Sequence, residues 1–410
     1  MNALLKVALM NAVLAQAPVV TPTADEVPPA APAPAPEAPP PATTTDQPQT
    51  PLAGWVTGEG FRLKSESGDY MLRVGLQAAY RFQPTWENGD SAERSAIPFM
   101  RPILRGNLYK PWITFWTSME LAGNPPYLLD AYFDVAPISE FGFRAGQQYT
   151  PYGRQEQLGP QQLFFPEWAP VADYFWPGRD KGLQVYGLVA DKRFEYYLGI
   201  FAGSPLRQTE SIPGNQEAQF RLAINPLGPT KPDEFPFTSE GGWLPFRFAV
   251  GVNGYEGKIQ TSVENFNQDN GQLFAEPTGF TFKTWDVGGD VWAQGGPLIF
   301  TAEPSWRRIE PQDATPAHDQ FGAWGQLLCA IWKDKIAAGV QVNWLDPNTA
   351  ISNDESFEIQ GDVNWFIHTP ELVLKLRYAH VKQDEPGVEE TLPWVPGTTN
   401  LLTLQFNLSF

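Results

Sequence analysis

The 410-residue sequence predicts an all-β fold, namely a transmembrane antiparallel β-barrel of about 16 strands that follows an N-terminal disordered Pro-rich segment. Three observations lead to this prediction. Apolar residues recur at every second position in most segments after Trp55. Aromatic residues are abundant, with 15 Trp and 27 Phe, although the mean hydropathy is −0.30. The connections between the segments alternate between short and long, which is typical of outer-membrane barrels.

Each predicted strand is an alternating segment that is bounded by Gly, Pro, Asn or Asp, the residues that form turns. No apolar run reaches about 18 residues, so the sequence predicts no transmembrane helix in the mature protein. The predicted strands are 70–82, 99–109, 112–121, 128–136, 140–149, 179–190, 193–203, 219–226, 245–255, 279–293, 297–309, 319–332, 335–345, 356–367, 371–382 and 400–410.

The alternating loop lengths favour a membrane barrel over a soluble β-sandwich, because a sandwich has no reason to alternate them. If the first strand rises from the periplasm, the even connections should be short and periplasmic. The short connections include 110–111, 137–139, 191–192, 294–296, 333–334 and 368–370, and the long ones include 150–178, 204–218, 256–278 and 383–399. Only the Pro-rich connection 227–244 breaks this parity, which leaves open a miscounted strand.

The N-terminal region predicts export and a spacer. Residues 1–15 are typical of a signal peptide, with Lys6 before a short apolar core, and residues 16–54 form a Pro/Ala-rich disordered spacer. Between Pro18 and Pro51 there are 12 prolines in 34 residues, too many to build a core. The stretch 18–51 either tethers the barrel to peptidoglycan or a periplasmic partner, or is a solvated leader. Residues 55–410 form the predicted barrel.

Composition excludes several functions. The formal charge of −18 argues against nucleic acid as a partner. The three His residues lie far apart and the only cysteine is Cys329, so we expect no metal site and no cofactor. No catalytic Ser motif accompanies a His, and we predict no enzyme. A carbohydrate-binding β-protein would also use the many Trp residues, but Trp near strand ends is what a membrane-interface girdle requires.

The apolar face of each strand should contact lipid, so the opposite face should line the barrel interior. The basic residues predicted to line it are Arg73, Arg81, Arg101, Arg105, Arg144, Arg221, Arg247, Lys375 and Arg377, and the acidic ones are Glu120, Asp130, Asp134, Glu195, Asp286, Asp290, Glu303, Glu358 and Asp362. The basic residues concentrate on one predicted wall and the acids on another, which would set up a transverse field. The alternative is that they pair across neighbouring strands.

The long connection 150–178 has seven aromatics in 29 residues, more than a solvated loop should contain. We therefore predict that it packs inside the barrel and narrows it. Its candidate gating charges are Arg154, Glu156, Glu167, Asp173, Arg179 and Asp180. The alternative is that its aromatics dock a neighbouring subunit or lie among lipopolysaccharide.

Three stretches resemble the phosphate-selective porin O and P family of Gram-negative outer-membrane porins. They are GFRLKSESGDYMLRVGLQAAYRF (60–82), RPILRGNLYKPWITFWTSMELAG (101–123) and LLDAYFDVAPISEFGFRAGQQYTPYGR (128–154). The C-terminal residues Phe406, Leu408 and Phe410 are similar to the insertion signal of such barrels, which the barrel-assembly machinery reads. The resemblance implies a homotrimer in the outer membrane, in contact with lipid and lipopolysaccharide. It does not imply phosphate selectivity, because Gln148 stands where a Lys is expected and the connection 256–278 has only Lys258.

The predicted function is therefore that of an outer-membrane porin. Small polar or ionic solutes would diffuse passively through a charge-lined channel that a loop constricts, and the spacer would lie in the periplasm. The alternative is a structural or plugged outer-membrane barrel that tethers the envelope through its Pro-rich N-terminal segment.

Overall fold

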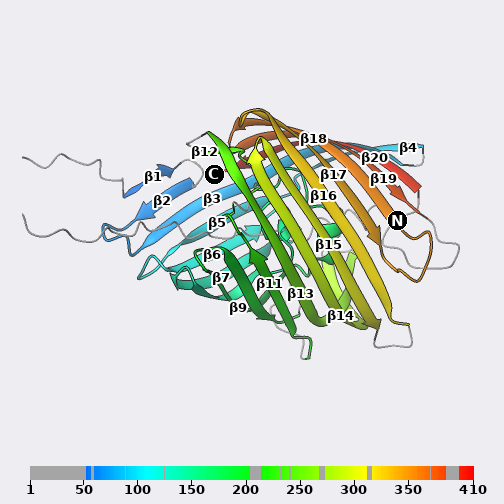
Figure 1. Cartoon of the computed structure of the whole chain (residues 1–410), viewed down its shortest axis with the longest axis horizontal. Coiled ribbons are helices and arrows are strands. Elements are labelled where there is room, and N and C mark those ends of the chain that lie inside the picture. The colour runs from blue at the N-terminus through cyan, green and yellow to red at the C-terminus, as the bar shows by residue number, and fades with distance from the viewer. Residues whose placement is uncertain are drawn as a thin grey trace, which may run out of the picture.

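The structure is a computed structural model, and most of its barrel is described (Figure 1). The described residues are 52–56, 60–87, 89–123, 125–203, 214–230, 233–239, 242–266, 273–311, 316–369, 371–384 and 397–410, with the side chains of 259–282 and of residue 239 left aside. The predicted signal peptide and almost all of the predicted spacer lie outside these residues.

Among the described residues, 16 strands close an antiparallel barrel. Each pairs with its neighbours in sequence order, and the last strand returns to the first, with Gln405 opposite Arg81. All the predicted strands are confirmed. They are β3 (Met71–Glu87), β5 (Met100–Asn107), β6 (Ile113–Glu120), β7 (Tyr127–Ile138), β8 (Phe141–Tyr149), β9 (Arg179–Val189), β10 (Phe194–Phe201), β11 (Glu217–Ile224), β13 (Gly242–Phe266), β14 (Leu273–Gly296), β15 (Leu298–Pro311), β16 (His318–Trp332), β17 (Ile336–Asp346), β18 (Ser356–His368), β19 (Leu372–Gln383) and β20 (Gly397–Ser409).

Shorter elements extend the barrel at both ends. The hairpin β1 (Ala53–Val56) and β2 (Gly60–Lys64) adds to the start of β3, at the end where the C-terminus lies (Figure 1). The strand β1 begins two residues inside the stretch predicted to be disordered. At the opposite end, β4 (Asp90–Ala96) pairs with the outer half of β3. The strand β12 (Thr238–Ser239) and the helices η1 (Gln155–Gln157) and α2 (Pro170–Phe175) lie within connections.

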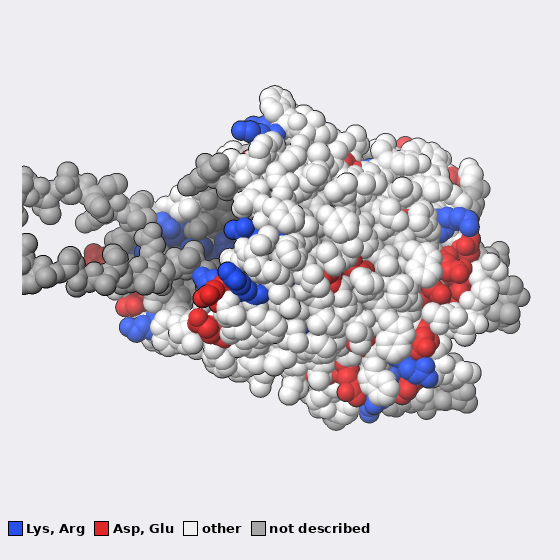
Figure 2. Space-filling view, viewed as in Figure 1, with Lys and Arg blue, Asp and Glu red and all other residues white. Residues whose placement is uncertain are grey.

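The barrel wall alternates between apolar residues that face out and polar residues that face in. On β18, Ile359 and Val363 are exposed, whereas Asp362 is buried. On the face shown in Figure 2, charged side chains gather at the two ends and few reach the band between them. An apolar outer band of this kind is what lipid contact requires.

The described part of the chain includes no helix that is both long and apolar enough to cross a membrane.

Two predicted connections differ from the structure. The predicted loop 256–278 was wrong, because β13 runs to Phe266 and β14 begins at Leu273. The alternating β-branched residues of 259–263 favour the extended chain, and each arm supplies the backbone partners of the other. At 227–244 no barrel strand was miscounted, since β11 pairs directly with β13, with Ile224 opposite Val250. Residues 233–239 of this connection lie inside the barrel instead.

The C-terminus completes the seam of the barrel. The backbone N–H of Leu76 donates to the carbonyl of Phe410 at 2.9 Å, and the N–H of Phe410 donates to the carbonyl of Leu76 at 3.0 Å. The Phe410 ring lies 4.9 Å from the Trp55 ring of β1. On β20 the side chains of Phe406 and Leu408 are exposed on the outer face. The last strand therefore removes the open edge that an unclosed sheet would leave.

Candidate functional site: the barrel interior

The strand alternation places the predicted interior residues on the polar face of their strands. Asp130, Asp362 and Lys375 are at most 2% exposed. Three basic residues, Arg73, Arg105 and Arg247, and two acids, Glu195 and Glu358, are half-buried, and the others of both predicted sets are buried.

Several of these charges form ion pairs inside the barrel. Five pairs have N–O distances of 2.5–2.8 Å, and they are Arg101–Glu120, Arg144–Asp134, Arg179–Asp130, Arg221–Asp290 and Arg307–Asp286. Each joins residues of adjacent or nearby strands, which favours the pairing alternative over two separate walls of unlike charge for these residues. Sequence reasoning missed Arg307, although the alternation that assigned Glu303 to the interior also assigns Arg307 there.

The other predicted acids contact neutral groups or lie beside a cation. Glu303 accepts the backbone N–H groups of Arg154 and Gln155, both at 3.0 Å. Asp362 lies opposite Arg377 in the register of β18 and β19. Polar amide side chains reach the remaining two, because Asn225 donates to Glu195 at 3.5 Å and Asn343 donates to Glu358 at 3.4 Å. The half-buried Arg73 and Arg105 face each other on β3 and β5, and Arg247 donates to the Phe246 carbonyl at 3.1 Å.

The connection 150–178, here called the internal loop, lies inside the barrel as predicted. Its apolar residues Leu163, Phe164 and Phe165 are fully buried. The ammonium of Lys375 on β19 donates to the carbonyls of Leu163 at 2.7 Å and Phe165 at 3.0 Å. The amide of Asn364 on β18 donates to the Phe164 carbonyl at 2.8 Å. The inner wall of β18 and β19 therefore holds the middle of the internal loop.

A second part of the internal loop is held by arginines. Glu167 pairs with Arg81 of β3 and lies 3.6 Å from Arg377 of β19. Burial raises the pKa of the Glu167 carboxyl, but the two guanidinium groups outweigh it and lower this pKa to about 2. Burial raises the pKa of Asp173, on α2, to about 7, and the charge of Glu167 adds to this effect.

The remaining candidate gating charges lie near the two ends of the internal loop. Arg154 donates to Thr230 at 3.2 Å. Glu156 is buried, and burial together with the nearby Glu303 raises the pKa of its carboxyl well above its usual range. Arg179 belongs to an ion pair, and Asp180 accepts the Gly203 N–H at 2.5 Å. Both residues lie at the start of β9.

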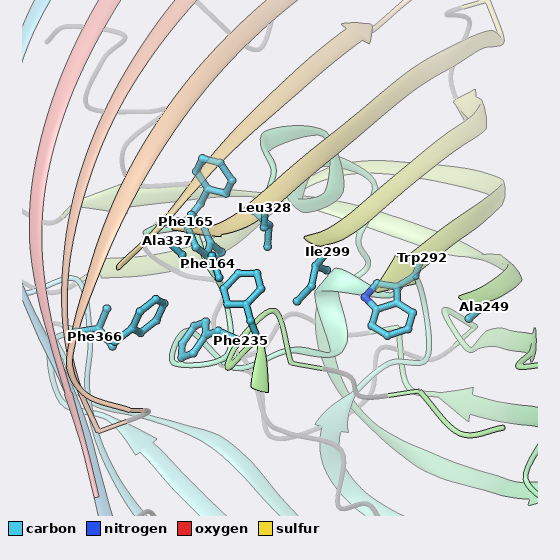
Figure 3. Packing of buried hydrophobic residues seen from close by; sticks show 12 residues of the cluster. Phe164, Phe165, Phe235, Ala249, Trp292, Ile299, Leu328, Ala337 and Phe366 are labelled. Atoms are coloured by element: carbon cyan, nitrogen blue, oxygen red, sulfur yellow. The ribbon is translucent and has the colours of Figure 1, made fainter. Parts of the chain in front are cut away.

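A second segment enters the barrel from the connection between β11 and β13. We call residues 233–239 the inner segment. Glu234, Phe235 and Phe237 are at most 3% exposed. The rings of Phe235 and Phe237 pack with Phe164 and Phe165 of the internal loop and with inner-wall residues from β13 to β19. Figure 3 shows this core. Sequence reasoning missed these residues, because a Pro-rich connection has no periodicity that would signal burial.

The described residues offer no grouping of three or more His, Cys, Asp or Glu that could hold a metal ion. His380 Nδ1 lies 2.9 Å from the amide oxygen of Asn400, and His368 Nδ1 lies 2.8 Å from a carboxylate oxygen of Glu371.

Several solved structures have the same fold as this chain but share little sequence identity with it. A porin described as anion-selective, from Comamonas acidovorans, matches with a TM-score of 0.53 and 11% identity over 83% of this chain and 100% of its own. OprB of Pseudomonas putida matches with a TM-score of 0.54 and 12% identity over 83% and 94%. The outer membrane channel DcaP of Acinetobacter baumannii matches with a TM-score of 0.52 and 12% identity over 85% and 99%. No family model and no curated protein sequence matches the chain. At these identities the likeness establishes the fold.

Proposed function

We propose that the chain is a porin of a Gram-negative outer membrane, through which small polar or ionic solutes diffuse passively. The observation that carries this proposal is a closed barrel with an apolar outer band and a charged interior. The channels with the same fold support it. Hydrocarbon excludes solutes of this kind, and a barrel with a polar interior provides a wet route past it.

The charged interior residues are proposed to line this route, and the internal loop is proposed to constrict it. Paired charges keep such an interior wet without giving it one strong sign, so both small cations and small anions would pass. Glu167 is the candidate gate, because it bridges from the loop to Arg81 and Arg377 on the wall. No bond is made or broken in this mechanism, so no catalytic residue is required.

Assembly and partners belong to the same proposal. A homotrimer, contacts with lipopolysaccharide, insertion by the barrel-assembly machinery and a periplasmic spacer at 18–51 with affinity for peptidoglycan all follow from the resemblance to phosphate-selective porins O and P or from the spacer composition. Arg101 pairs with Glu120, so its positive charge is not free to attract an anion, and phosphate selectivity is not proposed.

A structural or plugged barrel is the second candidate, and one observation favours it. The internal loop and the inner segment together fill part of the interior with buried aromatic residues. Such a barrel would act through its N-terminal spacer rather than through a pore.

Planar-bilayer conductance of the refolded protein under a KCl gradient tests the two candidates. Stepwise conductance in three coupled levels supports an open trimeric porin, and the sign of the reversal potential reports which charges govern passage. A folded, heat-modifiable barrel that never conducts would reject the diffusion channel in favour of the plugged barrel.

A further inference from the structure

The inner segment forms one hydrophobic core with the internal loop. Phe164 lies edge-on to Phe237, with ring centroids 6.4 Å apart. Figure 3 shows Phe235 near Phe366, and the centroids of these two rings are 4.9 Å apart. The barrel residues of this core come from seven neighbouring strands, β13 to β19, and they are Ala249, Trp292, Ile299, Leu328, Ala330, Ala337, Phe366 and Val373. Most lie close to the strand ends at the side of the short connections.

A polar contact network ties the two segments together at one residue. The Glu234 carboxylate accepts the backbone N–H of Phe164 at 2.5 Å and the side-chain amides of Gln155 at 2.9 Å and Gln326 at 2.6 Å. In return, the Glu234 N–H donates to the Gln162 carbonyl at 3.1 Å. Glu234 thus bonds to the first part and to the middle of the internal loop and to the barrel wall on β16.

The other end of the inner segment is fixed to a short connection. Asp334, between β16 and β17, accepts the Phe237 N–H at 3.1 Å and the Thr238 hydroxyl. A two-residue turn between β11 and β13 would lack Phe237 and Thr238 and could not make these contacts. The additional residues of the connection between β11 and β13 therefore make contacts inside the barrel and do more than link the two strands.

We propose that the inner segment is a second constriction element, which closes the β13–β19 side of the barrel at the short-connection end and is held there by Glu234. This inference rests on the proposed diffusion function and deepens it, since it confines solutes to the side of β3 and β5–β11. There, Arg73 and Arg105 are only half-buried at the same end. The internal loop and the inner segment then set the width of the passage together, and neither sets it alone.

The test compares two variants with the wild type in planar bilayers. One is Glu234→Ala, and the other replaces residues 227–241 by an Asn-Gly hairpin turn. Glu140→Ala is the control, because Glu140 is an exposed acid in another short connection at the same end. We expect both variants to raise single-channel conductance by about twofold, since conductance grows with open cross-section, and the control to leave it unchanged.

A second readout does not depend on conduction. Ala337 is 1% exposed in the shared core, so Ala337→Cys combined with Cys329→Ser gives one buried thiol. A membrane-impermeant maleimide should label it at least about tenfold faster when Glu234 is Ala, because three hydrogen bonds to a buried carboxylate are lost. Heat-modifiable mobility verifies that each barrel is folded.

The outcomes separate the two proposals. Faster labelling with higher conductance supports both. Faster labelling in barrels that never conduct means that Glu234 holds the inner segment as part of a plug, and this result rejects the diffusion channel and the second constriction together. Unchanged labelling in both variants overturns the second constriction, whatever the wild type conducts.

Discussion

Removing the Lys375 ammonium should release the internal loop from the barrel wall. Lys375 is fully buried and donates to two loop carbonyls, those of Leu163 and Phe165, at 2.7 and 3.0 Å. Lys375→Met keeps the length of the side chain and its apolar contacts but removes both donors. The change therefore tests whether this contact, rather than the burial of the loop aromatics, keeps the loop docked.

The size of the effect follows from opposing contributions. Each hydrogen bond from a charged group contributes about 1.5–3 kcal/mol, whereas removing a buried ammonium recovers part of its desolvation cost. We take the net loss to be about 2 kcal/mol for the docked loop. Since about 1.4 kcal/mol corresponds to a tenfold change in equilibrium, the undocked population should rise about 30-fold.

Limited proteolysis of the folded barrel measures this population. A protease that cleaves beside large apolar residues reaches Leu163–Phe165 only when the loop leaves the wall, and its rate then follows the open population. Lys382→Met is the matched control on the same strand, because the Lys382 side chain is 60% exposed and pairs with Asp384. Cleavage of Lys375→Met at the wild-type rate would refute the reasoning.

Three further outcomes are expected. Phe237→Ala should cost about 3–5 kcal/mol in urea unfolding by leaving a cavity in the shared core, whereas Phe246→Ala, at a 60% exposed residue, should cost far less; equal losses would contradict a packed core. The pKa of Glu167 falls from 4.5 to about 2, so its stabilisation of the loop is complete above about pH 4.5 and is lost as the pH falls toward 2. Protease cleavage of the loop should therefore increase below pH 4 in the wild type but not in Glu167→Gln. A wild-type rise already at pH 6 would reverse this assignment. Phe410→Ala should lower the yield of inserted barrel in cells without preventing refolding in detergent, because the closing backbone bonds remain; Trp55→Ala tests the ring contact alone and should insert normally.

The strand pattern could be predicted from sequence because it is local. Alternation along a strand decides which face meets lipid, and this needs no knowledge of the partner strand. All 16 barrel strands were found in this way. The burial of the connection 150–178, which includes Phe164 and Phe165, was predicted instead from its seven aromatics. Strand alternation also placed Asp130 and Lys375 on the interior face, where both are fully buried.

The partners in the ion pairs could not be predicted from the sequence, for a different reason. Arg179 pairs with Asp130 across 49 positions, and Glu167 bridges to Arg81 and Arg377, which are far away in the chain but close around the closed barrel. Which acid meets which base depends on register and on where the loop lies, and neither leaves a periodic signal. Strand alternation by itself therefore left two possibilities open, namely two opposed walls of unlike charge or pairs across neighbouring strands.

By itself, the sequence determined a closed barrel with an apolar outside and a charged inside, because the period of two is a property of each strand. Only the tertiary structure decided how full the interior is. The inner segment around Glu234 and Phe237 is a Pro-rich connection in the sequence, yet it is buried once 16 strands surround it. A loop acquires its environment from the barrel that encloses it, and that environment exists only after the last strand has paired with the first.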